Sequence, residues 1–159
     1  MTNCTALSIE SPLGEITILG DDQGISRVWF GSDPDLDPGR EPHHLMRACA
    51  DQLQEYFRGQ RRRFTVKLAL EGTSFQRRVW DELVTIPFGE VRAYSDVAKS
   101  INRPKAARAV GGANNANPVA IIIPCHRIIG KDRRLVGYGS GLWRKEWLLK
   151  HEQALNQKV

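Results

Sequence analysis

The sequence predicts an α/β (α+β) protein with a small N-terminal α/β domain built on an antiparallel sheet and a mainly helical C-terminal domain. Two observations predict this class. Apolar residues alternate between turn formers from residue 11 to residue 30, which is typical of antiparallel strands. Beyond residue 72, apolar residues instead recur at helical spacing. We therefore predict two domains, 1–72 and 73–159, the second containing a helix-turn-helix and a strand that leads to a cysteine.

The N-terminal domain is predicted to begin with a β-meander. Turns rich in Gly, Pro and Asp flank stretches of alternating apolar residues, and the predicted strands are 15–19 and 25–30. Residues 31–42 are predicted to form an exposed loop. A helix follows over 43–58, with its apolar side chains on one face, and 64–68 is a candidate further strand.

The C-terminal domain is predicted to open with a capped helix, because residues 73–76 have the T-x-x-Q spacing of a capping box. A shorter helix is predicted over 94–101, with Ser95 as its N-cap. A tight connection leads to a second helix, predicted over 105–113 with Pro104 at its first position. Two short helices joined by a tight turn indicate a helix-turn-helix.

The second helix of this pair has an unusual outer face. Projection at about 100° per residue predicts an inward face of small apolar residues, namely Ala106, Ala109, Val110 and Ala113. Arg108 lies on the opposite face, beside Gly111 and Gly112. Glycine costs about 1 kcal/mol in a helix interior, so this bare face favours close approach by another molecule. It lacks the polar side chains that read base edges, which argues against sequence-specific recognition. An ordinary helical hairpin whose glycines end the helix is the alternative.

An apolar run over 119–123 leads directly into Pro124, Cys125 and His126. The run is short and β-branched, so it predicts a buried strand. Proline removes a backbone donor and ends the strand, and a histidine beside a cysteine can draw off the thiol proton. The sequence thus indicates a nucleophilic thiol at a fixed point, although a cysteine in this position is more often a small core residue.

The charge distribution differs between the two halves of the chain. Residues 1–72 carry 8 basic and 11 acidic side chains, whereas residues 73–159 carry 15 basic and 7 acidic ones. The basic second half indicates a polyanionic partner, with a merely solvated surface as the alternative. No stretch has the length and apolarity of a membrane span and no leading signal is recognised, so we expect no membrane partner and a cytoplasmic protein.

Several motifs occur together in unbroken order between about residue 72 and residue 152. They comprise 72–76, 86–90, 104–113, Asn117-Pro118, Ile123-Pro124-Cys125-His126-Arg127, Gly137-Tyr138 and 144–149. This set resembles the O6-alkylguanine-DNA alkyltransferases, the methylated-DNA–protein-cysteine methyltransferases. The resemblance implies direct repair of O6-alkylguanine, and less readily of O4-alkylthymine, in double-stranded DNA. It also implies irreversible transfer of the alkyl group to Cys125, once per chain, without a cofactor.

The resemblance also assigns roles to the residues of the reaction. Cys125 is the implied acceptor, and His126 is the implied base that removes its proton through a water. Glu152 is implied to orient His126, and Asn117 to brace the turn before the cysteine strand. Helical projection places Glu152 on the inward side of the terminal helix, where a carboxylate needs a partner because an unpaired buried charge is costly.

The same resemblance implies that the protein, which we expect to be a monomer, enters duplex DNA from the minor groove without sequence specificity. Tyr94 is implied to rotate the phosphate of the lesion and to donate to the base. Arg108 is implied to fill the gap left by the extruded nucleotide. The remaining lesion contacts are expected from the helix face at Gly111 and Gly112, from the carbonyls of Cys125 and Ile128, from the Gly139 amide, and from Tyr138 and Ser140.

Two features concern departures from the family pattern. Ser140 stands where the family usually has glycine, beside the alkyl pocket, which puts tolerance of bulky groups such as benzyl in doubt. Some relatives carry zinc in the N-terminal domain, but the candidate ligands are poorly spaced, so we predict no metal; these ligands are Cys4, His43, His44 and Cys49.

Three other functions are considered from the sequence. A non-catalytic lesion-binding relative would lack the acceptor cysteine, which is present here. A helix-turn-helix regulator would need a dimerisation or effector element, and none is evident. A Cys-His-Glu hydrolase would turn over and would not require the helix on which Arg108 stands beside Gly111 and Gly112.

Overall fold

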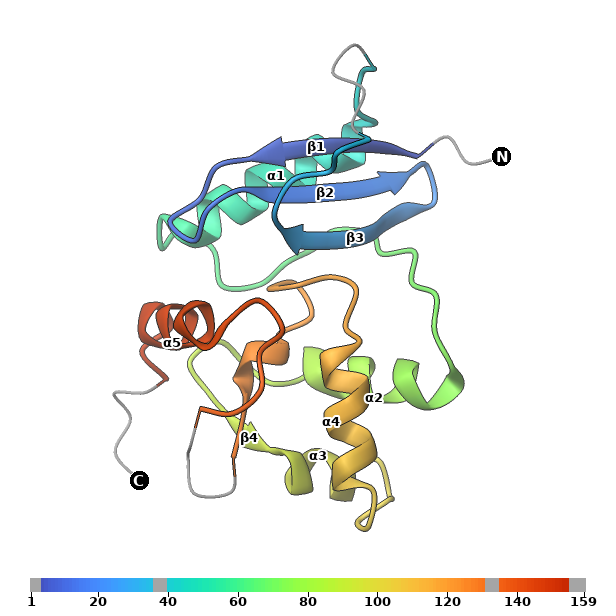
Figure 1. Ribbon diagram of the computed structural model, residues 1–159, viewed down its shortest axis with the longest axis vertical. Helices are drawn as coiled ribbons and strands as arrows, with labels where there is room; N and C mark the ends of the chain where they lie inside the picture. Colours follow the sequence, from blue (N-terminus) through green and yellow to red (C-terminus); the bar gives the residue numbers. More distant parts are fainter. Residues whose placement is uncertain (1–3, 36–39, 131–134, 155–159) are drawn as a thin grey trace. The chain divides into compact units, whose positions relative to one another are not determined.

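The computed structural model describes residues 4–35, 40–130 and 135–154. It divides into two compact units, the first formed by Met1–Glu71 with Pro118–Ala120 and the second by Gly72–Asn117 with Ile121–Val159 (Figure 1). An antiparallel sheet in the first unit and a mainly helical second unit confirm the predicted α/β class. The predicted domain limits, 1–72 and 73–159, stay a prediction. None of the helices in the described ranges is long and apolar enough to cross a membrane.

The sheet of the first unit is a meander of three antiparallel strands. Strand β1 (Thr5–Ile9) pairs with β2 (Ile16–Asp21), and β2 pairs with β3 (Gly24–Phe30). The two strands predicted between residues 15 and 30 are confirmed, whereas β1 was not predicted. Gly24 opens β3 with a φ of 137°, a left-handed conformation that favours glycine.

Helix α1 (His44–Phe57) packs on this sheet (Figure 1). It confirms the helix predicted over 43–58, and the side chain of His43 caps it by accepting from the backbone nitrogen of Leu45 at 3.2 Å. Its buried face carries Met46, Cys49, Ala50, Leu53 and Tyr56. Of the loop predicted over 31–42, residues 36–39 lie outside the described residues, and the described part contains neither helix nor strand.

Two predicted strands are corrected. The candidate strand at 64–68 is reduced to one bridge between Leu68 and Ile25. The strand predicted over 119–123 is wrong: Val119 forms one bridge with Val28, and the chain then turns at Ile121, whose φ is 71°. The run is apolar because its residues are packed inside, and an apolar run looks the same whether a buried segment is extended or turned.

The second unit begins with helix α2 (Ser74–Val84), and the predicted capping box is confirmed. The Oγ1 atom of Thr73 accepts from the Gln76 nitrogen, and Oε1 of Gln76 accepts from the Thr73 nitrogen, both at 3.0 Å. The buried indole of Trp80 donates from Nε1 to the carbonyl of Ala113 at 2.9 Å. This bond connects α2 to the helix that carries Arg108.

The predicted helix-turn-helix consists of α3 (Tyr94–Ser100) and α4 (Ala107–Asn115). The prediction that Ser95 is the N-cap of the first helix is wrong. Ala93 occupies that position, and its backbone nitrogen donates to Oδ2 of Asp96 at 2.9 Å. Asp96, at the third helical position, thus accepts from the backbone of the N-cap residue, and Ser95 lies inside the first turn as the second helical residue.

The predicted start of the second helix is also wrong. Pro104 does not open α4, because the nitrogen of Ala106 donates to the carbonyl of Arg103 at 2.9 Å and closes a turn with the proline at its second position. Before this turn, Asn102 adopts a φ of 61°, and the nitrogen of Arg103 donates to the carbonyl of Ala98 at 2.8 Å. This Schellman-type ending stops α3 at Ser100. Helix α4 then begins at Ala107, two residues later than predicted.

The faces of α4 largely follow the projection. Val110 and Ala113 are buried, and Arg108 is exposed. Ala109 is exposed rather than inward, contrary to prediction. Asn114 is buried instead, so the inward face is centred on Val110, and Ala109 lies at its edge about 100° from Val110.

The rest of the second unit positions the cysteine. A single turn of 3-10 helix, η1 (Cys125–Arg127), leads into β5 (Ile128–Ile129), which pairs in parallel with β4 (Arg92–Ala93). Helix α5 (Leu142–His151) packs against η1. Because β4 directly precedes α3, this pairing brings the start of the helix-turn-helix beside the cysteine turn.

Candidate active site

The turn that carries Cys125 is held from both sides. The nitrogen of Cys125 donates to the carbonyl of Ile123 at 2.8 Å, and Nδ2 of Asn117 donates to the same carbonyl at 2.8 Å. Asn117 follows the end of α4, so its amide links that helix to the cysteine turn. A bracing asparagine is predicted at this position, although the cysteine stands on a 3-10 turn and not on a strand.

Cys125 is buried, with 8% of its surface exposed. Burial raises the pKa of the Cys125 thiol, while a hydrogen bond from Asn117 and the charge of Lys145 act in the opposite direction. The raised pKa means that the thiol holds its proton at rest. The site must therefore remove this proton when a substrate is bound.

His126 follows Cys125 in the 3-10 turn, where successive side chains point about 120° apart. Both residues thus stand in a 3-10 turn and not in a strand. Among the described residues, no hydrogen bond joins the Cys125 thiol to the His126 ring. The Nδ1 atom of His126 is buried and has no hydrogen-bond partner in the described part of the protein.

The ring of His126 lies in a buried charged cluster. Its Nε2 atom is 2.7 Å from Oε2 of Glu152, and both side chains are fully buried. Arg127 contacts the same carboxylate: its Nε lies 2.8 Å from Oε1 and its Nη2 lies 3.1 Å from Oε2. The third nitrogen of the guanidinium, Nη1, donates to the carbonyl of Ile86 at 2.6 Å. Glu152 directly follows α5 as its C-cap, so the cluster joins this helix to the cysteine turn.

Electrostatics determines which atom of His126 carries the proton. Burial would raise the pKa of Glu152, but His126 and Arg127 outweigh it and hold this pKa well below its usual range. Burial lowers the pKa of His126, so the ring is neutral. An ionised carboxylate can only accept, so Nε2 of the ring must donate to it. The lone pair is then on Nδ1, which can take up a proton.

Lys145 is a second buried cation in this region. None of its surface is exposed, and its Nζ donates to the carbonyls of Val136 and Gly137 at 2.7 and 3.3 Å. Burial lowers its pKa to about 8, and the neighbouring Cys125 acts in the opposite direction. Lys145 thus holds the segment before Tyr138 and places a positive charge near the thiol.

Tyr94 stands at the start of α3, directly after β4. Its hydroxyl oxygen lies 3.5 Å from the carbonyl oxygen of Val136. A Cβ atom built on Gly111 would lie 3.6 Å from Cε1 of its ring, and one built on Gly137 would lie 3.3 Å from its hydroxyl. Burial raises the pKa of Tyr94, and the nearby Cys125 adds to this effect. The tyrosine is thus lodged between two glycines and keeps its proton at neutral pH.

The other predicted lesion residues lie on two segments. Arg108 and Gly112 are exposed on α4, and Gly111 is half-buried. Ile128 is buried in β5, and a turn closed by the nitrogen of Gly141 and the carbonyl of Tyr138, at 2.9 Å, contains Gly139 and Ser140. Burial raises the pKa of Tyr138 well above its usual range, and Cys125 adds to this effect. The structure brings Asn117, Cys125, His126 and Glu152 together; the lesion roles of the other residues stay predictions.

Two residues of the site, Arg127 in the buried cluster and Lys145 near the thiol, were missed as functional residues. Arg127 directly follows His126 in the sequence, and the buried carboxylate of Glu152 needs more compensation than one neutral imidazole ring provides. Lys145 is three residues before Leu148 and seven before Glu152, on the inward face of α5. A lysine at an inward position of a helix is the signal that could have identified it. In the described part of the chain, no group of three His, Cys, Asp or Glu side chains could hold a metal ion.

Comparison with known proteins places the chain in a family. Residues 74–154 match the family model of the 6-O-methylguanine DNA methyltransferase DNA binding domain, and residues 7–70 match that of the ribonuclease-like domain of the same enzymes. A methylated-DNA–protein-cysteine methyltransferase of Methanosarcina acetivorans is 50% identical over 147 residues, which are 90% of this chain and 94% of the relative. One from Mycolicibacterium paratuberculosis is 43% identical and covers 92% of this chain and 90% of its own length.

Solved structures agree with this assignment. A crystal structure of Mycobacterium tuberculosis OGT in complex with DNA is 43% identical, with a TM-score of 0.85 over 94% of this chain and 93% of that one. The Mycobacterium tuberculosis O6-methylguanine methyltransferase, also solved in crystals, is 42% identical with a TM-score of 0.84 over 95% of this chain and 93% of that one. Since both halves of the sequence match and the fold agrees over nearly the whole chain, this protein belongs to the 6-O-methylguanine DNA methyltransferase family.

Proposed function

We propose that this protein repairs alkylated DNA directly, by moving the alkyl group from O6 of guanine in a DNA duplex to Sγ of Cys125. O4-alkylthymine is a poorer substrate of the same reaction. The transfer is irreversible, happens once per chain and needs no cofactor. The observation that carries this proposal is the buried hydrogen-bonded chain from Arg127 through Glu152 to His126, next to a cysteine on a braced turn. Membership of the family and the homologues named as methyltransferases support it.

The proton of the thiol leaves first. It passes through a water to Nδ1 of His126, and the imidazolium that forms is stabilised by Glu152. The thiolate then attacks the alkyl carbon from the side opposite O6. The S–C bond forms as the C–O6 bond breaks, and the electron pair of the broken bond stays on the guanine. Tyr94 donates a hydrogen bond to the leaving guanine, which takes up a proton from water as the imidazolium of His126 returns its own proton to water.

The thioether product explains why the protein acts once. A thioether offers no good leaving group to water, so the alkyl group stays on Cys125. A hydrolase with a Cys-His-Glu arrangement would instead form a thioester that water can cleave. The proposed enzyme is therefore consumed by its own reaction.

DNA binding in this proposal is the task of the helix-turn-helix formed by α3 and α4. The protein, as a monomer, binds the minor groove without sequence specificity, and Arg108 enters the duplex where the damaged nucleotide has been swung out. The exposed backbone at Gly112 lets the helix approach the groove closely. The extruded guanine is held by the carbonyls of Cys125 and Ile128, the Gly139 amide, Tyr138 and Ser140.

One experiment tests the reaction. The protein is incubated with duplex DNA that carries a radiolabelled O6-methylguanine, and the label on protein is counted after the DNA is digested. We expect one label per chain at saturation, and none with Cys125→Ser, which keeps a similar volume. A lesion binder or a regulator would take up no label, and a hydrolase would keep none, so either result would overturn the proposal.

A further inference from the structure

The turn from Tyr138 to Gly141 carries three of the proposed lesion contacts, Tyr138, Gly139 and Ser140. The nitrogen of Gly141 donates to the carbonyl of Tyr138 at 2.9 Å and closes the turn. A glycine with a positive φ stands at each end, because Gly137 precedes the turn with a φ of 61° and Gly141 ends it with a φ of 108°. Glycine is conformationally permissive, so the turn keeps its place only if other groups restrain it.

Two cations at the start of α5 supply this restraint. Arg144 and Lys145 stand in the first turn of the helix, where a positive charge opposes the helix dipole. Helical side chains point back toward the N-terminus, and both cations reach back to backbone carbonyls. Lys145 holds the two carbonyls that precede the turn, and Nη1 of Arg144 donates to the carbonyl of Ser140, inside the turn, at 2.5 Å.

Trp143 holds the guanidinium of Arg144 in this position. The Cζ atom of Arg144 lies 4.5 Å from the centroid of the Trp143 ring, a cation–π arrangement. The same ring packs against the end of the turn, since a Cβ atom built on Gly141 would lie 3.2 Å from its Cδ1 and 3.3 Å from its Nε1. Trp143 is 54% exposed, so its ring supports the turn and the guanidinium and is not part of the core.

The restrained turn lies near the thiol. Burial raises the pKa of Tyr138, Cys125 adds to this effect, and the charge of Arg144 acts in the opposite direction. The thiol and the guanidinium both act on this hydroxyl, so both lie close to it. A displacement of the turn would therefore change the surroundings of Cys125.

We propose that Arg144, supported by Trp143, is a positioning residue that holds the Tyr138–Gly141 turn in place and thereby limits the size of the alkyl group that reaches Cys125. The proposal rests on the proposed function, because the turn limits size only if an alkylated guanine enters beside the thiol. A fixed wall in a closely packed site accepts a small group, whereas a larger group must displace the wall. Methyl transfer should therefore be faster than benzyl transfer.

The test compares two duplexes of one sequence, which carry either O6-methylguanine or O6-benzylguanine. The single-turnover rate of methyl transfer is divided by that of benzyl transfer, at saturating protein, so that effects on duplex binding cancel. We expect Arg144→Met to slow methyl transfer by about tenfold, because the turn no longer holds the base at reacting distance. Benzyl transfer should slow less, so the ratio falls. Arg144→Lys, which can still donate to Ser140, should restore most of the ratio, and Trp143→Ala should give an intermediate value.

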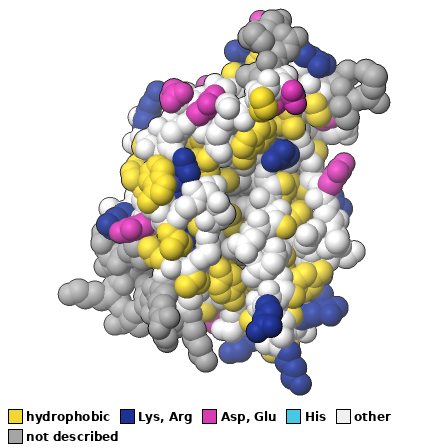
Figure 2. All heavy atoms as spheres, viewed as in Figure 1, with side chains coloured by type: hydrophobic (Ala, Val, Ile, Leu, Met, Phe, Trp, Pro, Cys, Tyr) yellow, Lys and Arg dark blue, Asp and Glu magenta, His cyan; other side chains and the backbone are white. Residues whose placement is uncertain are grey.

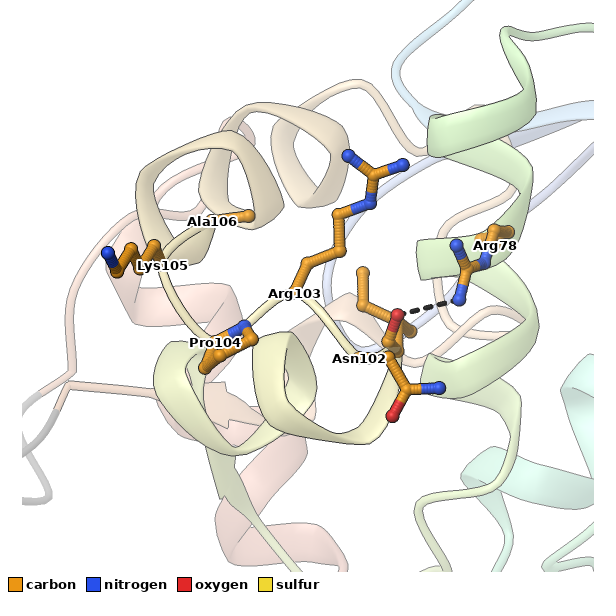
Figure 3. A pocket seen from close by; sticks show the side chains of 7 residues that line it. Arg78, Asn102, Arg103, Pro104, Lys105 and Ala106 are labelled. Carbon is orange, nitrogen blue, oxygen red and sulfur yellow. Dashed lines mark hydrogen bonds between the residues drawn. The ribbon is translucent and has the colours of Figure 1, made fainter.

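The matched control is Arg78→Met. On the face shown in Figure 2, Lys and Arg side chains gather at the end of the second unit where α3 and α4 are joined. Arg78 of α2 also donates to a backbone carbonyl, because its Nη2 lies 2.6 Å from the oxygen of Ile101, shown as the dashed line in Figure 3. Its loss removes the same charge and the same kind of bond but leaves the Tyr138–Gly141 turn intact, so the ratio should not change. An equal fall in this control, or an unchanged ratio in Arg144→Met, would refute the positioning role.

A second measurement separates this proposal from the proposed function. Hydrogen exchange of the Gly141 amide, which donates to Tyr138, reports on the turn without any DNA. We expect faster exchange in Arg144→Met and no change in Arg78→Met. If the unmodified protein transfers neither alkyl group while exchange becomes faster, the proposed reaction is wrong and the restraint of the turn stands. If transfer occurs and neither the ratio nor the exchange rate changes, the reverse holds.

Discussion

Arg127 grips the carboxylate of Glu152 with two nitrogen atoms, Nε at 2.8 Å from Oε1 and Nη2 at 3.1 Å from Oε2. A planar guanidinium that meets both oxygens fixes the plane of the carboxylate as well as its charge. The same carboxylate then orients His126 through Nε2, at 2.7 Å. Arg127, which follows His126 in the sequence, thus fixes the carboxylate of Glu152 that orients the His126 ring.

The first prediction concerns this grip. Arg127→Met leaves the carboxylate of Glu152 buried without its permanent cation, and breaking a buried ion pair from one side costs about 3–5 kcal/mol. We expect the free energy of unfolding, measured by urea denaturation, to fall by about this amount. Arg127→Lys keeps the charge and loses the two-point grip, so its loss should be smaller. A methionine variant as stable as the unmodified protein would show that the pair contributes nothing.

The second prediction concerns acid stability. The pKa of Glu152 is lowered in the folded protein, so its stabilising effect is present above the unfolded pKa of about 4.3 and is lost as the pH falls. His126 acts in the same direction, because its pKa is also lowered and the unfolded chain takes up a proton below about pH 6.5.

We therefore expect the free energy of unfolding to decrease from about pH 6.5 downward and more steeply below about pH 4.3. Glu152→Gln should be less stable at neutral pH and should lose the steeper part of the dependence. Urea denaturation at a series of pH values measures both curves. Two parallel curves would mean that Glu152 does not contribute to acid unfolding.

The third prediction concerns Lys145. Its charge favours the Cys125 thiolate, so Lys145→Met should raise the pKa of the thiol and slow alkyl transfer at pH 7 by about tenfold, the effect of one pKa unit. The rate should recover as the pH is raised, whereas a purely structural defect would not respond to pH. In the unmodified protein, the plot of transfer rate against pH should change slope near pH 8, where Lys145 itself loses its proton.

Lys145→Arg serves as the control for this charge, since it keeps the cation and can still donate to the carbonyls of Val136 and Gly137. We would measure the single-turnover rate of transfer from a methylated duplex from about pH 6 to 9, a range that spans the lowered pKa of Lys145. Identical pH profiles for the methionine variant and the unmodified protein would contradict the role of the charge.

The fourth prediction separates stability from DNA binding at Gly112. No atom lies within 4 Å of a Cβ atom built at this position, which is exposed in the interior of α4. Gly112→Ala should therefore raise the free energy of unfolding by about 1 kcal/mol through helix propensity. If the bare helix face meets DNA, the added methyl group should weaken duplex binding. Thermal denaturation and fluorescence anisotropy measure the two effects, and unchanged DNA affinity would exclude a close approach at Gly112.

The fifth prediction concerns the protein after reaction. Cys125 is almost fully buried, so an added alkyl group must displace its neighbours, and overfilling of this kind typically costs about 1–3 kcal/mol. The melting temperature of fully methylated protein should be lower than that of fresh protein. Cys125→Ser treated with the same DNA controls for residual DNA, and an unchanged melting temperature on methylation would contradict a closely packed site.

Sequence patterns predicted those elements whose cause is local. The capping box before α2, the helix over 44–57 and the two strands between residues 16 and 30 all follow from side chains within a few residues of one another. The start of α4 and the N-cap of α3 were wrong because a proline and a serine fit several positions of a turn equally well. The apolar run before Cys125 was taken for a strand because burial alone made it apolar.

The sequence alone determined the thiol of Cys125, the neighbouring His126, the helix that carries Arg108 and the family. These features are carried by residue types in a fixed order. The tertiary structure decided what surrounds them. It joined Arg127, Glu152 and His126 into one buried cluster and placed Lys145 near the thiol. Such contacts join residues far apart in the chain, and their strength depends on burial, which only the packed fold creates.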